Sequence, residues 1–192
     1  MISWILSDKP LLSMQNLQIN NKGICAEARF IASPNVDKRP DGIDISLIVI
    51  HNISLPPNQY GGEGVAQLFT NQLDPQAHPY FQEIAHLKVS SHFFIRRNGE
   101  LVQFASCLDR AWHAGVSQWQ GRERCNDFSI GIELEGSDFE DFEPHQYNTL
   151  QALIDALKAT YPVQDITGHS DIATGRKTDP GPHFNWNKIK TW

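Results

Sequence analysis

The stretch ISLIVIHN, residues 45–52, gives the strongest indication of the fold. Its centre, residues 47–50, is continuously apolar and mostly β-branched. Such a run is typical of a strand buried on both faces, which occurs where helices cover the two sides of a sheet. We therefore expect a central strand of an α/β domain here, with His51 at its carboxyl end.

Neighbouring segments predict the rest of the sheet. Residues 129–136, SIGIELEG, alternate apolar and polar side chains, as a strand does. The pair Asn98-Gly99 separates two alternating runs, which is the strongest short-range sign of a β-hairpin. Because a hairpin joins antiparallel strands, we expect a sheet of mixed direction.

Helical spacing of apolar residues predicts helices over 62–72 and 79–86 and a long helix that begins at Pro144 and stops at Pro162. The expected buried stripe of the long helix is Tyr147, Leu150, Leu153, Ile154, Leu157 and Tyr161. The fold class that follows is α/β (α+β), with a central mixed β-sheet flanked by helices. We expect one domain over residues 23–192, preceded by an N-terminal extension over residues 1–22.

Composition excludes several classes of protein. Of the 192 residues, 40% are hydrophobic and 20% charged, so the chain can build a core that needs no metal to hold it together. The net charge is −6 and the chain has no run of Lys or Arg, so we expect no nucleic-acid partner and no attraction to an anionic membrane. No obligate protein partner is predicted.

The cysteines and the N-terminus indicate a compartment. Three cysteines without a CxxC pair favour reduced thiols over a disulfide framework. The N-terminus lacks a basic region, and Asp8, Lys9 and Pro10 interrupt its apolar run, so it makes a poor signal peptide. No apolar run is long enough to cross a membrane. The sequence therefore predicts a cytoplasmic protein.

The segment TGHSDIATGRKTDPGPHF, residues 167–184, combines polar side chains with frequent glycine and proline. We expect it to be a loop, without helix. Its His169 and Asp179, together with His51, have the ligand types of a catalytic zinc site with one open position. The alternatives are a structural His51 and a chance triplet, since the chain has eight histidines. The rival ligands are His78, His86, His92, His113, His145 and His183.

Three further side chains are open to two interpretations. Glu133 and Glu135 share one face of their strand, which is either solvated or the place of a general base. Lys177 is either a solvated lysine or, beside a metal, a stabiliser of an oxyanion.

Long ordered blocks of the chain resemble the AmpD family of cytoplasmic 1,6-anhydro-N-acetylmuramyl-L-alanine amidases, within the amidase_2 and peptidoglycan-recognition superfamily. The blocks are HNISLPPNQYGGEG (51–64), HPYFQEIAHL (78–87), SSHFFIRRNGELVQ (90–103), RAWHAGVS (110–117), GRERCNDFSIGIELEG (121–136), TGHSDIA (167–173) and RKTDPGP (176–182). The resemblance extends from about Ala26 to Trp186.

The resemblance implies a zinc amidase of peptidoglycan recycling. It makes His51, His169 and Asp179 the Zn²⁺ ligands, Glu133 the acid/base group and Lys177, beside Asp179, the catalytic stabiliser of the oxyanion. The implied substrate is an anhydromuropeptide, cut between the lactyl group of the sugar and L-alanine. For binding it, we expect Trp112 against the sugar ring and Arg124 or Arg176 on the carboxylates of the peptide stem.

Two alternatives remain. A broader amidase acting on intact peptidoglycan would favour an export signal or a basic wall-binding module, and neither is visible. A recognition module that binds muropeptide without cutting is expected to lack a zinc ligand, whereas this chain has all three implied ligands.

Overall fold

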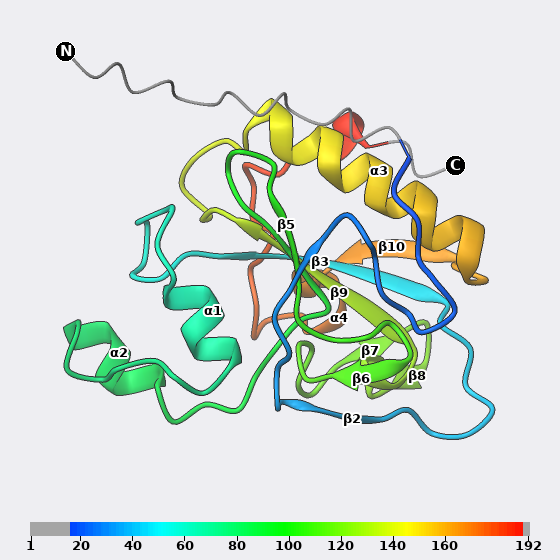
Figure 1. The fold of residues 1–192 in the computed structure, drawn as a ribbon, viewed down its shortest axis with the longest axis horizontal. Coiled ribbons are helices and arrows are strands. Elements are labelled where there is room, and N and C mark those ends of the chain that lie inside the picture. The colour runs from blue at the N-terminus through cyan, green and yellow to red at the C-terminus, as the bar shows by residue number, and fades with distance from the viewer. Residues whose placement is uncertain (1–15, 190–192) are drawn as a thin grey trace, which may run out of the picture.

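The structure is a computed structural model that describes residues 16–189. Within this range a six-stranded sheet crosses the molecule (Figure 1). Its strands in spatial order are β1 (Arg29–Phe30), β5 (Leu101–Gln103), β4 (Phe93–Ile95), β9 (Ser129–Glu135), β3 (Leu47–Ile53) and β10 (Asp165–Gly168). Only the β4–β5 pair is antiparallel among these neighbours, and Gly99 at its turn has φ 85°. The mixed sheet and the hairpin are thus confirmed.

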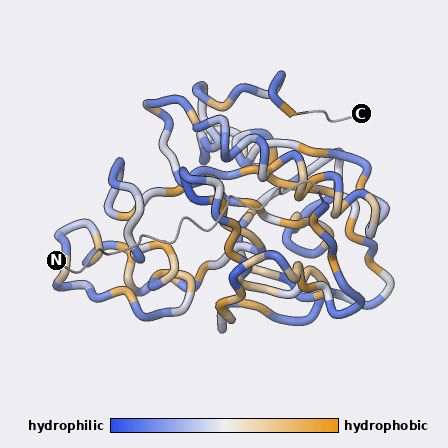
Figure 2. The backbone as a smooth tube through the Cα atoms, turned by 45° about the horizontal axis from the view of Figure 1, so that its top comes forward, coloured by the Kyte–Doolittle hydropathy of each residue, from blue (hydrophilic) through white to orange (hydrophobic). Residues whose placement is uncertain are grey.

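Strand β3 is central, as its apolar run predicts. Ile48 and Ile50 point into a core under the long helix α3 (Pro144–Thr160), whereas Leu47 and Val49 point into a cluster on the opposite face. This division follows from the two-residue period of a strand. In Figure 2 hydrophobic segments run through the middle of the molecule and the outer loops are mostly hydrophilic.

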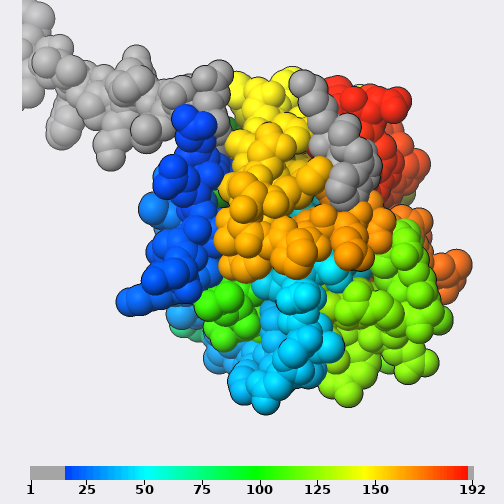
Figure 3. Space-filling model, turned by 90° about the vertical axis from the view of Figure 1, so that its right-hand side faces the viewer, coloured from blue at the N-terminus to red at the C-terminus, as the bar shows by residue number. Residues whose placement is uncertain are grey.

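Helix α3 covers one face of the sheet with the predicted stripe. Tyr147, Leu150, Leu153, Ile154 and Leu157 are buried, and the partly buried Tyr161 packs against the same core. The helix starts at Pro144 with a capping box in which Glu143 and Gln146 each satisfy a backbone N–H of the other. Leu17 belongs to the same core, and Figure 3 shows the described N-terminal residues alongside α3. The rest of the expected extension, residues 1–15, lies outside the described residues.

Shorter elements cover the opposite face and its edge. Helices α1 (Gly64–Phe69) and α2 (Pro79–Ile84) match the two predicted helices and pack with Phe94, Val102 and Phe104 of the hairpin region. The remaining elements are β2 (Val36–Lys38), which pairs with β6 (Asp109–Ala111), β7 (Gln118–Trp119), which pairs with β8 (Arg122–Glu123), and the 3₁₀ turns η1 (Cys125–Asp127) and η2 (Trp186–Lys188).

The segment after residue 167 is only partly the expected loop. Thr167 and Gly168 end strand β10, and α4 (His169–Ile172) forms a single helical turn. The expectation of no helix was wrong because Gly168 precedes the turn, and the Asp171 carboxylate accepts the Gly168 N–H and so caps it. In the described part of the chain, no helix is long and apolar enough to cross a membrane.

Candidate metal centre and active site

Three neighbouring parallel strands deliver the candidate residues to one edge of the sheet. His51 of β3 lies opposite Glu133 of β9 in the strand register. Gly168 at the end of β10 lies opposite Ile50, so that His169 follows at the same level. The carboxyl ends of strands in such sheets are where ligands are commonly bound. The predicted clustering of His51, His169 and Glu133 therefore follows from the sheet order.

The three expected metal ligands meet at a single point. His51 Nδ1, His169 Nδ1 and Asp179 Oδ2 lie 3.0 Å from one another in all three pairs. Both histidines are buried and Asp179 is partly buried. Among the described residues this triplet is the one group of His, Cys, Asp and Glu with spacing suited to a metal ion.

Local contacts hold Asp179 in this position although it lies in an irregular segment. Its carbonyl oxygen accepts the backbone N–H of Ser170 at 2.8 Å, which ties the loop to the start of α4. The Asn52 amide donates to the carbonyl oxygen of Pro180 at 3.1 Å. Gly168 permits the close approach, because a Cβ there would lie 2.8 Å from Pro180 Cδ.

The donor set fits a zinc ion. Tetrahedral ligands at about 2.0–2.2 Å from zinc lie roughly 3.3–3.6 Å apart, a few tenths of an ångström more than the spacing observed here. Burial lowers the pKa of His51 to about 4, so its imidazole is neutral at pH 7. Two neutral imidazoles and one carboxylate are ligands that zinc commonly takes.

Glu133 lies beside this triplet without a partner of its own. Its side chain is 8% exposed, and Oε2 has no hydrogen-bond partner among the described residues. Burial raises the pKa of Glu133 well above its usual value, the charge of Asp179 raises it further, and Lys177 opposes both. A carboxyl group with a raised pKa is suited to exchange protons near neutral pH.

Glu135 differs from Glu133 although the two share a strand face. It is also buried, so the solvated reading of this face was wrong for both residues. Its two oxygens accept the backbone N–H groups of Gly61 at 2.6 Å and Arg97 at 3.0 Å. Glu135 therefore fixes two loops and has little capacity left for proton transfer.

A cavity of about 470 Å³ opens over the triplet. Its walls include His51, His169, Asp179, Glu133, Lys177 and Arg176. Arg176 also donates to the carbonyl oxygens of Ala114 at 2.9 Å and Val116 at 2.6 Å.

Two of the expected substrate residues lie elsewhere. Arg124 lines a separate cavity beside this one, shared with Arg176, and its side chain pairs with Asp127 at 3.2 Å. Trp112 lines neither cavity.

Two groups next to the ligands were not predicted to contact them, and His113 was considered only as a rival ligand. His51 Nε2 lies 2.9 Å from His113 Nδ1, and His169 Nε2 lies 3.1 Å from the carbonyl oxygen of Ala114. Both residues belong to the block RAWHAGVS, in which Trp112 was the residue expected to bind the substrate. A histidine and a small residue side by side carry no periodic signal, so the block itself was the only available sign.

Comparison with known proteins agrees with the geometry. Residues 41–182 match the Amidase_2 family, described as N-acetylmuramoyl-L-alanine amidase. The 1,6-anhydro-N-acetylmuramyl-L-alanine amidase AmpD of Escherichia coli (strain K12) is 56% identical over 171 residues, which cover 88% of this chain and 93% of that protein.

Solved structures show the same fold. The crystal structure of a selenomethionine AmpD derivative matches with a TM-score of 0.86 and 56% identity, over 88% of this chain and 96% of that one. A complex of the amidase AmiD from E. coli with the substrate anhydro-N-acetylmuramic acid-L-Ala-D-γ-Glu-L-Lys matches with a TM-score of 0.57 and 29% identity, over 81% of this chain and 62% of that one. The chain therefore belongs to the Amidase_2 family of N-acetylmuramoyl-L-alanine amidases and resembles its AmpD members over most of its length.

Proposed function

We propose that this chain is a zinc-dependent amidase that hydrolyses the amide between 1,6-anhydro-N-acetylmuramic acid and L-alanine. The observation that carries the proposal is the triangle of His51 Nδ1, His169 Nδ1 and Asp179 Oδ2, 3.0 Å on each side, next to the unpartnered Oε2 of Glu133. The names of the most similar relatives supply the bond that is cut.

His51, His169 and Asp179 would hold the zinc ion. Zinc in such a site lowers the pKa of water to about 7 and acts as a Lewis acid on the amide carbonyl. The three side chains leave one side open toward the cavity, where the amide has access.

Glu133 is the acid/base group in this proposal. As a carboxylate it accepts the proton of the attacking water, and as an acid it then delivers this proton to the nitrogen of the departing L-alanine. Its burial and its raised pKa support this role, because a carboxylate with a raised pKa is a stronger base toward water, and the acid it becomes keeps the proton until the leaving amine accepts it.

Lys177 stabilises the oxyanion that forms at the carbonyl carbon. Its side chain is exposed at the wall of the cavity that contains Glu133 and Asp179. A fixed positive charge directed at developing negative charge favours the transition state over the ground state.

Recognition of the substrate is assigned to the cavity and its rim. Arg176 lines the cavity, which supports a contact with the carboxylates of a peptide stem, and Arg124 at the neighbouring cavity is the less supported candidate for this role. The place of Trp112 outside both linings makes a direct stacking role its least supported assignment. The substrate in the AmiD complex has the same sugar and L-alanine and an acidic residue after them.

The setting we propose is peptidoglycan recycling in the cytoplasm, by a catalytic domain over residues 23–192. The net charge of −6 supports a soluble anhydromuropeptide substrate, because an anionic cell wall would repel an acidic protein.

Mass spectrometry of an anhydromuropeptide incubated with the zinc-loaded protein tests the proposed function. We expect two products, the free peptide stem and the anhydro sugar acid, whose summed mass exceeds the substrate by one water. A parallel incubation with intact sacculi, at equal concentration of the amide bond, should release peptide more slowly. Cleavage at another bond, or faster release from sacculi, contradicts the proposal.

A further inference from the structure

We infer that His113 and the carbonyl of Ala114 hold both metal-binding histidines in the one tautomer that presents Nδ1 lone pairs, which makes His113 a positioning residue of the site. The inference rests on the proposed function, since it concerns how the same site receives its metal. The supporting contacts are those of His51 Nε2 and His169 Nε2, the ring nitrogens that point away from the metal position.

The chain of hydrogen bonds starts at Ser129. Its hydroxyl lies 2.6 Å from the carbonyl oxygen of Cys125, which only accepts, so the hydroxyl proton lies there. The same oxygen lies 3.0 Å from His113 Nε2. With its proton engaged, Ser129 Oγ accepts at this second contact, and His113 Nε2 is therefore the protonated nitrogen.

The contact between His113 and His51 determines the tautomer of His51. A neutral imidazole has one N–H, so His113 Nδ1 bears a lone pair. His51 Nε2 lies 2.9 Å away and must donate its N–H to it. Among the described residues no carboxylate contacts the partly buried His113 ring to favour its charged form. His51 is thereby left with an unprotonated Nδ1 that points at the metal position.

His169 reaches the same state by a shorter route. Its Nε2 lies 3.1 Å from the carbonyl oxygen of Ala114, the residue that follows His113. Since a carbonyl oxygen only accepts, Nε2 carries the proton and Nδ1 carries the lone pair. Adjacent residues of one segment thus set the tautomers of two ligands that lie 118 residues apart in sequence.

These tautomers bring three hydrogen-bond acceptors together, and a cation among them removes their mutual repulsion. Two lone pairs and one carboxylate oxygen face each other at 3.0 Å, with no proton assigned between them. Three acceptors at this distance repel one another unless a positive charge lies among them. The arrangement is therefore prepared for the metal before the metal binds.

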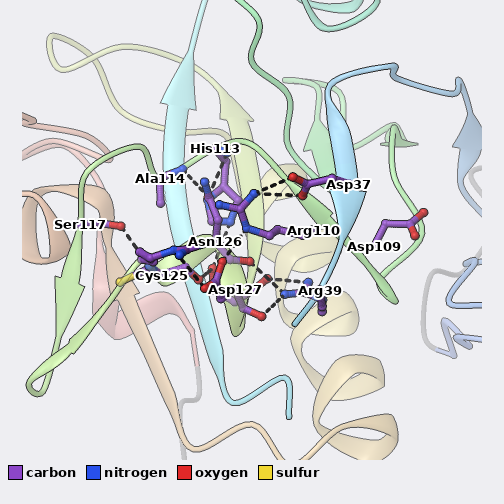
Figure 4. Close-up of polar contacts among 12 residues, drawn as sticks. Asp37, Arg39, Asp109, Arg110, His113, Ala114, Ser117, Cys125, Asn126 and Asp127 are labelled. Carbon is purple, nitrogen blue, oxygen red and sulfur yellow. Dashed lines mark hydrogen bonds and ion pairs between the residues drawn. The ribbon is translucent and has the colours of Figure 1, made fainter. Parts of the chain in front are cut away.

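The backbone of residues 113–114 is fixed by the side chain of Asn126. Asn126 Oδ1 accepts the backbone N–H groups of His113 at 3.2 Å and Ala114 at 2.8 Å (Figure 4). Gly131 on β9 leaves room for the imidazole, because a Cβ there would lie 2.5 Å from His113 Cγ.

Arg39 in turn fixes the strand-end segment that carries Asn126 and Ser129. Arg39 is 7% exposed, and its guanidinium group donates to four backbone carbonyl oxygens. These belong to Cys107, Asn126, Asp127 and Ser129, at 3.2, 3.0, 3.0 and 2.8 Å. The orientation of the metal ligands therefore depends on a continuous network of contacts that runs from Arg39 through Ser129 and His113 to His51.

Two substitutions at His113 separate positioning from simple packing. His113→Asn keeps an acceptor oxygen near the place of Nδ1, whereas His113→Leu fills the space without an acceptor. Leu150→Ala is the control for loss of a buried side chain, since Leu150 is fully buried in the core under α3 and belongs to none of these hydrogen bonds.

Zinc affinity and the tautomers of the metal-free protein are the readouts. Long-range proton–nitrogen NMR correlations should show wild-type His51 and His169 protonated at Nε2 and unprotonated at Nδ1. His113→Leu should populate both tautomers of His51 and bind zinc about 10–100-fold more weakly in competition with a chromophoric chelator. His113→Asn should recover most of the affinity, and Leu150→Ala should bind zinc like the wild type.

A wild-type His51 protonated at Nδ1, or unchanged zinc affinity in a folded His113→Leu, overturns the inference. If His113→Leu does not fold, the wild-type tautomers decide the question alone. Neither readout uses the substrate, so a protein that binds zinc with these tautomers but does not cut the amide contradicts the proposed function and leaves this inference standing.

Discussion

The two faces of the central sheet are built from the same strands and serve opposite purposes. Toward α3, strands β3 and β9 present Ile48, Ile50, Ile130 and Ile132, which are fully buried in one apolar core. Toward the other side the alternate positions of the same strands present His51 and Glu133. Successive residues of a strand point to opposite faces, so a shift of one residue in register would exchange the face that stabilises the fold with the face that carries the site.

The difference lies in what burial does to each face. Apolar groups on the α3 side gain about 25 cal/mol for each Å² removed from water. On the other side burial lowers the pKa of His51 and raises that of Glu133, so these groups are held away from their preferred charge states. The α3 face is therefore expected to govern stability, and the polar face to govern turnover.

The largest expected effect on the polar face is that of Glu133→Gln. The amide keeps the size of the side chain but cannot accept a proton, so kcat should fall by about 10²–10⁴ while bound zinc and the unfolding temperature stay near the wild-type values. The measurement is steady-state kinetics together with metal analysis.

Glu135→Gln is the matched control for this substitution. Glu135 accepts two backbone N–H groups and has no catalytic part in this account, so the variant should lose stability, by about 1–3 kcal/mol, with kcat largely kept. An active Glu133→Gln together with an inactive Glu135→Gln would reverse the assignment of the two carboxylates.

Lys177→Ala should lower kcat by about 10²–10³, because it removes a charge that acts on the transition state. Lys177 is exposed, so neither the unfolding temperature nor the zinc content should change. A rise in KM with an unchanged kcat would instead make Lys177 a contact that binds substrate and transition state equally.

On the α3 face, Leu150→Ala should show the opposite pattern. Leu150 is fully buried against the core, and its truncation should reduce the free energy of unfolding by about 2–5 kcal/mol. The kcat of the folded variant should equal that of the wild type, measured below its unfolding temperature. A large loss of kcat would show that the two faces are not separable.

Acid should weaken the folded state through His92. Burial, and after it the charge of Arg39, lowers the pKa of His92 to about 3. The unfolded chain binds a proton there near pH 6.5, so the stability contributed by neutral His92 is complete above about pH 6.5 and is lost as the pH falls toward 3. Between these values the free energy of unfolding should fall by about 1.4 kcal/mol per pH unit through this residue.

Urea unfolding of the wild type and His92→Leu between pH 7 and 4.5 measures this slope. The variant should show the shallower dependence, since its unfolded state binds one proton fewer. Equal slopes would mean that His92 is protonated in the folded protein.

The apolar half of the fold was predictable and the polar half only in part. An uninterrupted apolar run identifies β3, and Asn98-Gly99 identifies the hairpin, because both signals are local. The burial of Glu135 was not predictable, since it depends on two loops from distant parts of the chain that donate N–H groups to it. The orienting groups His113 and Ala114 act through contacts with residues more than 50 positions away, which no local pattern records.

Among the candidate site residues, family motifs were more informative than periodicity. The residues His51, His169 and Asp179 meet as the resemblance implies, although strand and loop patterns alone favoured a structural histidine at position 51. Trp112 shows the limit of the approach, because its position next to His113 in sequence does not bring its side chain into the cavity lining.

Turnover measured while zinc is added stepwise to the metal-free protein tests the central claim most directly. The account predicts that hydrolysis of the anhydromuropeptide rises in proportion to zinc, reaches its limit at one equivalent per chain, and disappears again with a chelator. Asp179→Ala, which removes one ligand from a core that folds without the metal, should bind zinc weakly and remain nearly inactive. Full turnover in a zinc-free preparation of the wild type would contradict the account.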